Sequence, residues 1–223
     1  VPSVARAVQL TQKAPVPAGA PYVLHLSRWD RLKDPVGVME AFARHVVPRV
    51  PAHLVLAGPS PSVVDDDPEG AQVLEEVLAA WADLPGDRRA AVHVAVLPLE
   101  AAANDLVVNA LQRGAAVVVK KSIGEGFGLG LTEALWKARP VVASAVGGVR
   151  EQVVDEVTGL LVDDPGDLRA AGAAIVRLVE HPGVAAALGR AGHRHVRRRF
   201  LEPRHLVRWT GLLQEVVSPR AGP

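Results

Sequence analysis

The chain has 223 residues, with 25 Lys and Arg against 24 Asp and Glu. This length suits one large domain or two small ones, and the near-neutral charge gives no argument for nucleic-acid or membrane binding. The absence of cysteine excludes a disulfide scaffold, a thiol nucleophile and a cysteine-ligated metal. No signal-peptide pattern opens the sequence, and no apolar run approaches the roughly 20 residues that span a bilayer. We therefore expect a soluble, cytoplasmic protein.

Three segments divide the sequence. Residues 1–21 are proline-rich and lack a sustained period, which predicts a linker or extended arm. Residues 22–217 alternate apolar runs with helical patterns, and residues 218–223 form a short tail. The middle segment is therefore the predicted folded domain.

Six short apolar runs are typical of strands buried on both faces. They lie at 22–27, 53–57, 92–97, 115–119, 140–143 and 159–162. Helical patterns lie between and after them, at about 36–46, 73–84, 104–113, 128–137, 148–154, 166–180, 183–199 and 203–217. The alternation predicts an α/β fold: a Rossmann-like, three-layer α/β/α domain with a six-stranded parallel sheet.

A glycine-rich turn, residues 124–130, follows the fourth predicted strand and leads into a helix. Free N–H groups at a helix start suit a phosphate, and glycines allow the backbone to approach it. The turn is not a P-loop, because no Gly-Lys-Ser/Thr sequence ends it. Nor does it fit the dinucleotide fingerprint G-x-G-x-x-G, since Leu129 or Leu131 occupies the last glycine position.

Carboxylates flank this turn at Glu125 and Glu133. A carboxylate repels phosphate, but it accepts hydrogen bonds from two neighbouring hydroxyls of a sugar or a ribose. One carboxylate on each side of a phosphate cradle fits a nucleotide diphospho-sugar. The alternative is that Glu125 caps a turn and Glu133 is a surface residue.

Two cations, Arg28 and Lys33, follow the first predicted strand. They are expected at the same sheet edge as the glycine turn, where they would neutralise a departing diphosphate. The alternative is an exposed loop with ordinary charges.

Other candidates are weaker. Asp65, Asp66 and Asp67 fit helix capping better than a metal site, and His25 fits a buried, hydrogen-bonded residue better than a catalytic one. The basic cluster Arg194 and 197–199 fits a solvated helix face.

Two helices leave alternatives open. Asn109, Gln112 and Arg113 either order the donor loops or form a solvated face. The apolar side of the last helix packs either on its own domain or, as in the family named next, on another.

The residues above resemble the C-terminal domain of GT-B glycosyltransferases of family GT4. Arg28 and Lys33 resemble the diphosphate-binding pair of that family, and Glu125 and Glu133 match its E-x7-E motif. The resemblance implies that Glu125 contacts the donor sugar and Glu133 the ribose. It also implies that backbone groups of neighbouring residues line the site, namely Gly126, Phe127, Gly128 and Leu129.

Softer segments resemble trehalose synthases of the glycosyltransferring type. They are residues 66–70, 108–113, 125–129, 133–137 and 145–148. One departure is 114–117, where Gly-Ala-Ala-Val replaces a segment that usually carries an acidic residue.

The resemblance implies transfer of glucose with retention from UDP-, ADP- or GDP-glucose to a sugar, with trehalose as the product and no metal or other cofactor. GT-B enzymes have two such domains, so we expect a missing N-terminal acceptor domain and an isolated chain that binds donor but is inactive. Two alternatives remain. One is another GT4 hexosyltransferase of the sucrose- or glycogen-synthase type, and the other is a non-catalytic nucleotide-sugar-binding module.

Overall fold

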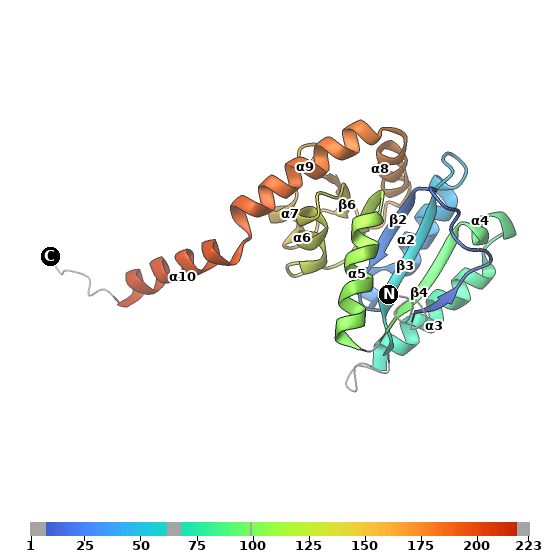
Figure 1. Cartoon of the computed structure of the whole chain (residues 1–223), viewed down its shortest axis with the longest axis horizontal. Helices are drawn as coiled ribbons and strands as arrows, with labels where there is room; N and C mark the ends of the chain where they lie inside the picture. The colour runs from blue at the N-terminus through green and yellow to red at the C-terminus, as the bar shows by residue number, and fades with distance from the viewer. Residues whose placement is uncertain (1–7, 62–67, 99, 218–223) are drawn as a thin grey trace.

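The computed structural model describes residues 8–61, 68–98 and 100–217. A central sheet carries helices on both faces, and one helix extends away from this body (Figure 1). The strands are β1 (Gln9–Thr11), β2 (Tyr22–Leu26), β3 (His53–Pro59), β4 (Val92–Leu97), β5 (Val117–Lys120), β6 (Val141–Ser144) and β7 (Leu160–Val162).

The helices follow the predicted alternation. They are α2 (Pro35–Ala41), α3 (Pro68–Asp83), α4 (Gly86–Ala90), α5 (Ala101–Gly114), α6 (Leu129–Trp136), α7 (Val149–Gln152), α8 (Leu168–Glu180), α9 (Pro182–Arg199) and α10 (Glu202–Val217). A 3-10 turn, η1 (Arg31–Lys33), precedes α2, and a π-helical turn, η2 (Phe42–Val46), continues it. The sequence did not predict η1 or α4.

The strand order is β1-β4-β3-β2-β5-β6-β7. Six strands are parallel, whereas β1 pairs antiparallel with the edge strand β4. The expected six-stranded parallel sheet is therefore wrong, because the sheet has seven strands and is mixed. The added strand comes from the predicted arm, where residues 9–11 at the sheet edge are largely exposed and so carry no apolar signature.

The order in which the chain adds strands to the sheet reverses between β2 and β5. The chain builds outward from β2 to β3 and β4, then returns to the other side of β2 to add β5, β6 and β7. In open parallel sheets such a reversal opens a crevice at the carboxyl ends of the two central strands, and ligands bind there. The loops after β2 and β5 therefore meet at one edge.

Two apolar clusters fix the layers. On one face of the sheet, α2, η2, α3 and α8 bury side chains such as Met39, Phe42 and Ile175. On the other face, α5, α6 and α9 pack on the sheet through side chains such as Leu135 and Val196. Burial of each such side chain contributes roughly 1.5–3 kcal/mol, so both faces of the sheet are firmly covered.

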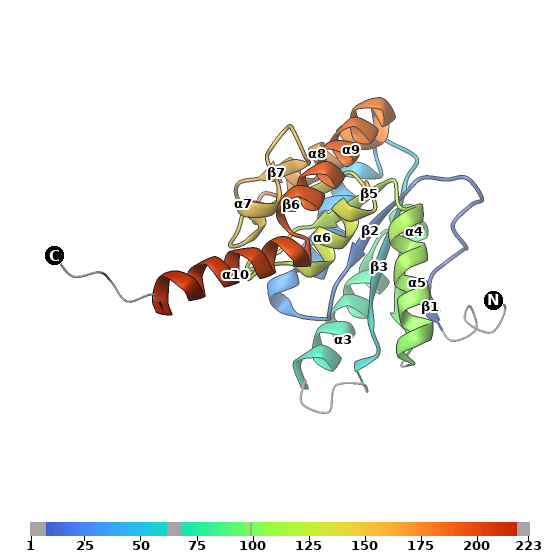
Figure 2. The ribbon, with the colours of Figure 1, turned by 60° about the vertical axis from the view of Figure 1, so that its left-hand side comes forward.

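Helix α10 leaves this body, as both views show (Figures 1 and 2). Its predicted apolar side carries Leu206, Trp209, Leu213 and Val216, which are 50% to 74% exposed. The option that this side packs on its own domain is wrong, and contact with another domain stays a prediction.

Among the described residues, no single helix is long and apolar enough to cross a membrane. Helices α8 and α9 satisfy that test only as a pair bent by 103°.

His25 lies near the carboxyl end of β2 and is 1% exposed. Its Nδ1 lies 3.3 Å from the Val119 carbonyl oxygen, and its Nε2 lies 3.0 Å from the Ser27 hydroxyl. The expectation of a buried, hydrogen-bonded histidine is confirmed. Burial, then the charges of Lys120, Lys121 and Lys33, lower the pKa of His25 to about 3.

This buried histidine makes stability depend on pH. His25 stays neutral in the folded chain, whereas unfolding restores a pKa near 6.5 and takes up a proton. Above pH 6.5 this residue is neutral in both states and does not change the free energy of unfolding. As the pH falls from 6.5 toward 3, the unfolded chain takes up the proton and the free energy of unfolding decreases. From pH 7 to 5 this one residue should lower the free energy of unfolding by about 2 kcal/mol, as measured by urea denaturation.

The matched variants are His25→Asn, which should reduce this pH dependence by about that amount, and His181→Asn at an exposed position, which should leave it unchanged. Part of the dependence should remain in both, because burial also lowers the pKa of His93, to about 4. An equal slope for wild type and His25→Asn would contradict the assignment.

Candidate functional site

The loop after β2 is held rigidly by Trp29. Its ring is 2% exposed, and its Nε1 donates to the Pro59 carbonyl oxygen at 2.7 Å. A β-carbon on Gly58 would lie 2.6 Å from this ring, so glycine is required beneath it. Asp30 accepts from the Leu32 N–H at 2.7 Å and so caps η1, the turn that ends at Lys33. The position of Lys33 is therefore set by the loop backbone.

The glycine turn after β5 contacts that loop directly. The N–H of Ile123 donates to the Leu32 carbonyl oxygen at 2.7 Å. Gly128 adopts φ +80, a left-handed conformation that favours glycine, and α6 begins directly after it. No side chain caps α6 within the described structure, so its first N–H groups have no side-chain acceptor. This helix start is suited to an anion.

A third loop, after β6, packs against the backbone of the glycine turn. The Gly148 N–H donates to the Gly126 carbonyl oxygen at 2.9 Å. A β-carbon on Gly147 would lie 1.9 Å from the Glu125 carbonyl oxygen, and one on Gly148 would lie 2.2 Å from that of Gly126. The two backbones therefore touch at a place where only glycine fits.

The structure joins two of the predicted residues in an ion pair. Lys33 Nζ lies 2.8 Å from Glu125 Oε2, with the side chains 17% and 12% exposed. Arg28 is 61% exposed and pairs with Asp30 at 3.2 Å, on the same loop as Lys33. Both predicted cations thus come from the loop after β2, but only Lys33 contacts the glycine turn.

Glu133 lies one helical turn into α6 and is held by α5. Gln112 Nε2 donates to Glu133 Oε2 at 3.0 Å, while Lys137 Nζ donates to Gln112 Oε1 at 2.5 Å. Gln112 is only 1% exposed, so it is not part of a solvated face. Arg113 Nε donates to Asn109 Oδ1 at 3.2 Å on the exposed side of the same helix.

The remaining predicted residues form the outer rim of the turn. Phe127 and Leu129 are 43% and 71% exposed, and Phe127 meets Phe200 edge to face at 5.8 Å between ring centroids. Gln152 donates to the Phe127 carbonyl oxygen and accepts from the Thr132 hydroxyl at 2.7 Å. The backbone of the turn is thereby fixed, while these two apolar side chains face solvent.

Two buried lysines at the end of β5 were missed by sequence reasoning. Lys120 is 8% exposed and donates from Nζ to the Leu26 carbonyl oxygen, whereas Lys121 is 2% exposed and pairs with Asp34. Burial lowers the pKa of Lys120 to about 8; Glu125 opposes this shift, and Lys33 adds to it. Two consecutive lysines closing an apolar strand were the available signal.

Within the residues that the structure describes, no group of three or more His, Asp or Glu side chains is arranged to hold a metal ion. Asp65, Asp66 and Asp67 lie outside the described residues. The site therefore consists of cations, free N–H groups and two carboxylates at one edge of the sheet.

The sequence model of the family described as "Glycosyl transferases group 1" matches residues 9–195. The chain belongs to this family. A trehalose synthase of Rubrobacter xylanophilus is 40% identical over 187 residues, covering 83% of this chain and 41% of that protein. A trehalose synthase of Pyrococcus horikoshii is 32% identical over 210 residues, covering 94% and 47%. The chain thus spans less than half the length of these relatives.

Solved structures agree with the family assignment. A sucrose-phosphate synthase from Thermosynechococcus elongatus superposes with TM-score 0.72 at 32% identity, covering 90% of this chain and 46% of that one. Anabaena Alr3699/HepE in complex with UDP-glucose superposes with TM-score 0.72 at 21% identity, covering 89% and 50%. The predicted GT4 resemblance and the Rossmann-like glycosyltransferase fold are therefore confirmed.

The contact between glycine loops yields a stability prediction. Gly147→Ala adds a β-carbon against the Glu125 carbonyl oxygen at φ +48, which should lower the free energy of unfolding by about 1–3 kcal/mol in urea denaturation. Gly126→Ala is the control, because nothing lies within 4 Å of its β-carbon, and should stay within about 0.5 kcal/mol of wild type. Equal losses for the two variants would refute the packing argument.

Proposed function

We propose that the chain is the donor-binding domain of a retaining glycosyltransferase that moves glucose from an NDP-glucose to a sugar acceptor, with glucose as acceptor and trehalose as product. The observation that carries this proposal is the Lys33–Glu125 pair, in which a cation and a carboxylate lie together at the reversal point of the strand order. The names of the trehalose synthase relatives and the UDP-glucose complex of the Anabaena protein support it.

Each residue has a proposed role. Arg28 and Lys33 bind the diphosphate, and the first N–H groups of α6, after Gly128, complete its cradle. Glu125 accepts from donor-sugar hydroxyls, and Glu133 accepts from the ribose diol. The backbone of Gly126, Phe127 and Leu129 lines the sugar and the phosphates.

The proposed reaction breaks the bond between the anomeric carbon and the diphosphate oxygen. The acceptor hydroxyl attacks from the same face, and its proton passes to the departing phosphate oxygen. Lys33 and Arg28 stabilise the negative charge that grows on the diphosphate, which is the largest electrostatic demand of the transition state. The proposal needs no protein nucleophile and no metal ion.

Two other assignments are separable by experiment. The sucrose-phosphate synthase neighbour favours a different hexosyl acceptor, which acceptor profiling of a longer protein that includes an N-terminal domain would reveal. A non-catalytic donor-binding module would show no transfer even when a separate N-terminal domain is added. Rescue of transfer by that domain supports the transferase.

Donor binding tests the proposal directly. Calorimetry should detect binding of at least one of UDP, ADP, GDP or their glucose conjugates. Lys33→Met should weaken this binding at least tenfold, or about 1.4 kcal/mol, because it removes a phosphate-binding charge and leaves Glu125 unpaired.

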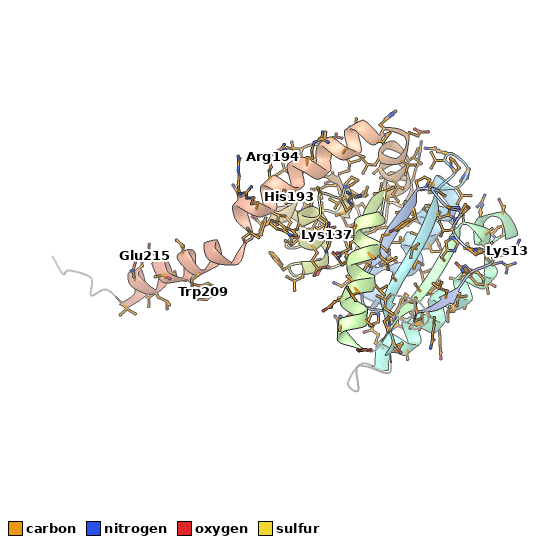
Figure 3. The ribbon with its side chains drawn as sticks, viewed as in Figure 1. Lys13, Lys137, His193, Arg194, Trp209 and Glu215 are labelled. Atoms are coloured by element: carbon orange, nitrogen blue, oxygen red, sulfur yellow. The ribbon has the colours of Figure 1, made fainter. Side chains whose placement is uncertain are left out.

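The matched control is Lys13→Met. Lys13 donates to the backbone carbonyl oxygen of Gly86 at 3.3 Å and lies exposed at the far edge of the sheet, away from Lys33 (Figure 3). The affinity of Lys13→Met for the nucleotide should equal that of wild type. No binding of any of these ligands to the wild-type chain would defeat the donor-site proposal.

The ribose role of Glu133 has its own test. Glu133→Ala should bind the preferred nucleotide about tenfold more weakly, because the carboxylate held by Gln112 no longer accepts from the diol. The variant should also lose discrimination between that nucleotide and its 2′-deoxy form. Glu180→Ala, an exposed carboxylate at the end of α8, is the control. Undiminished discrimination by Glu133→Ala would exclude the ribose contact.

A further inference from the structure

Lys120 occupies an unusual place in the sheet. It is the last residue of β5, it is 8% exposed, and its ammonium donates to the carbonyl oxygen of Leu26, the last residue of β2. Among the described residues, the ammonium makes this one hydrogen bond. The side chain therefore joins the two strands whose ends form the reversal point.

Strand alternation explains how neighbouring lysines separate. Lys121 points to the α2 face and is neutralised by Asp34, at the N-terminus of α2. Lys120 points to the opposite face, beneath α6. A β-carbon built on Gly130 would lie 3.0 Å from Lys120 Nζ, so the ammonium packs against the first turn of α6. Unlike Lys121, Lys120 has no carboxylate oxygen within 4 Å of its ammonium among the described residues.

This placement is electrostatically unfavourable by itself. The N-terminal end of a helix is its positive pole, so it repels a cation that packs beneath it. Burial also disfavours the charged form of lysine. A neutral amide could donate to the Leu26 carbonyl without these penalties, so joining β2 to β5 does not by itself explain a lysine.

The charged and titratable groups around Lys120 come from four elements. His25 on β2 is neutral, and Lys33 on η1 adds to the repulsion. Glu125 on the glycine turn and Glu133 on α6 are the compensating anions. Because Glu125 is already paired with Lys33, Glu133 is the remaining anion near Lys120, and among the described residues it forms no ion pair with that ammonium within 4 Å.

We propose that Lys120 is a positioning residue of the donor site, whose charge beneath the first turn of α6 adds to Lys33 and the helix pole in fixing a nucleoside diphosphate. This inference rests on the proposed function, since it assumes that the phosphates lie at the start of α6. It extends that function to a residue outside the Arg, Lys and E-x7-E set. The charge of Lys120 attracts the phosphates from the sheet side of α6, without direct contact.

The linkage between binding and protonation follows from this position. Burial lowers the pKa of Lys120 to about 8. A diphosphate above it favours the charged form, so the pKa rises when the ligand binds. Binding at pH 8.5 therefore takes up a fraction of a proton, and the affinity falls by up to about tenfold from pH 7 to pH 9.

The decisive measurement is proton uptake when UDP, or whichever of ADP and GDP binds, is added to the full chain. Calorimetry at pH 8.5 in two buffers of different ionisation enthalpy should show uptake of part of a proton by wild type. Lys120→Gln keeps a donor for the Leu26 carbonyl but should bind up to about tenfold more weakly at pH 7, without that uptake. Lys120→Arg, which stays charged, should retain most of the affinity at pH 7 and lose the uptake.

Lys13→Gln serves as the control and should match wild type in both affinity and proton uptake. Nucleotide binding by wild type without proton uptake, or with the same pH profile as Lys120→Gln, overturns the inference and leaves the donor site intact. Absence of any nucleotide binding overturns the proposed function and this inference with it. The wild-type measurement remains decisive even if a Lys120 variant fails to fold.

Discussion

The carboxyl edge of the sheet depends on the contact between the loop after β2 and the loop after β5. Lys33 and Glu125 are 92 residues apart in the chain, yet their side chains meet at 2.8 Å because β2 and β5 are neighbours in the sheet. The Ile123–Leu32 backbone hydrogen bond fixes the same contact independently of charge. A largely buried pair of this kind adds little net stability, but loss of one partner leaves a costly uncompensated charge. Its value lies in the geometry that it specifies.

Glycine carries this geometry from loop to loop. Gly128 allows the left-handed backbone from which α6 begins, and Gly147 and Gly148 allow the loop after β6 to touch the backbone of residues 125 and 126. Side-chain amides complete the support, because Gln152 holds the Phe127 carbonyl and Gln112 holds the Glu133 carboxylate. The glycine-rich turn is thereby held in one conformation, with the first N–H groups of α6 left without a side-chain acceptor.

The sequence predicted those parts of the structure that have a local signature. The six parallel strands were found within two residues at each end, because strands buried on both faces read as continuous apolar runs. Strand β1, turn η1 and helix α4 were missed because they are short and largely exposed, so tertiary pairing defines them. Lys120 and Lys121 were missed for a related reason, since a pair of lysines after an apolar strand marks their place in the chain but does not show that both will be buried.

The charges at this edge are consistent with the proposed binding of a diphospho-sugar. Lys121 is neutralised by Asp34 and Lys33 by Glu125, so each carboxylate that contacts a site cation is already engaged. Under the proposed function, a diphosphate would compete with Glu125 for Lys33. With that ammonium held by phosphate, the carboxylate of Glu125 would be released to accept from neutral hydroxyls, which do not repel it. On this argument the Lys33–Glu125 pair keeps both groups oriented and compensated until one ligand, bearing charge at one end and hydroxyls at the other, separates them.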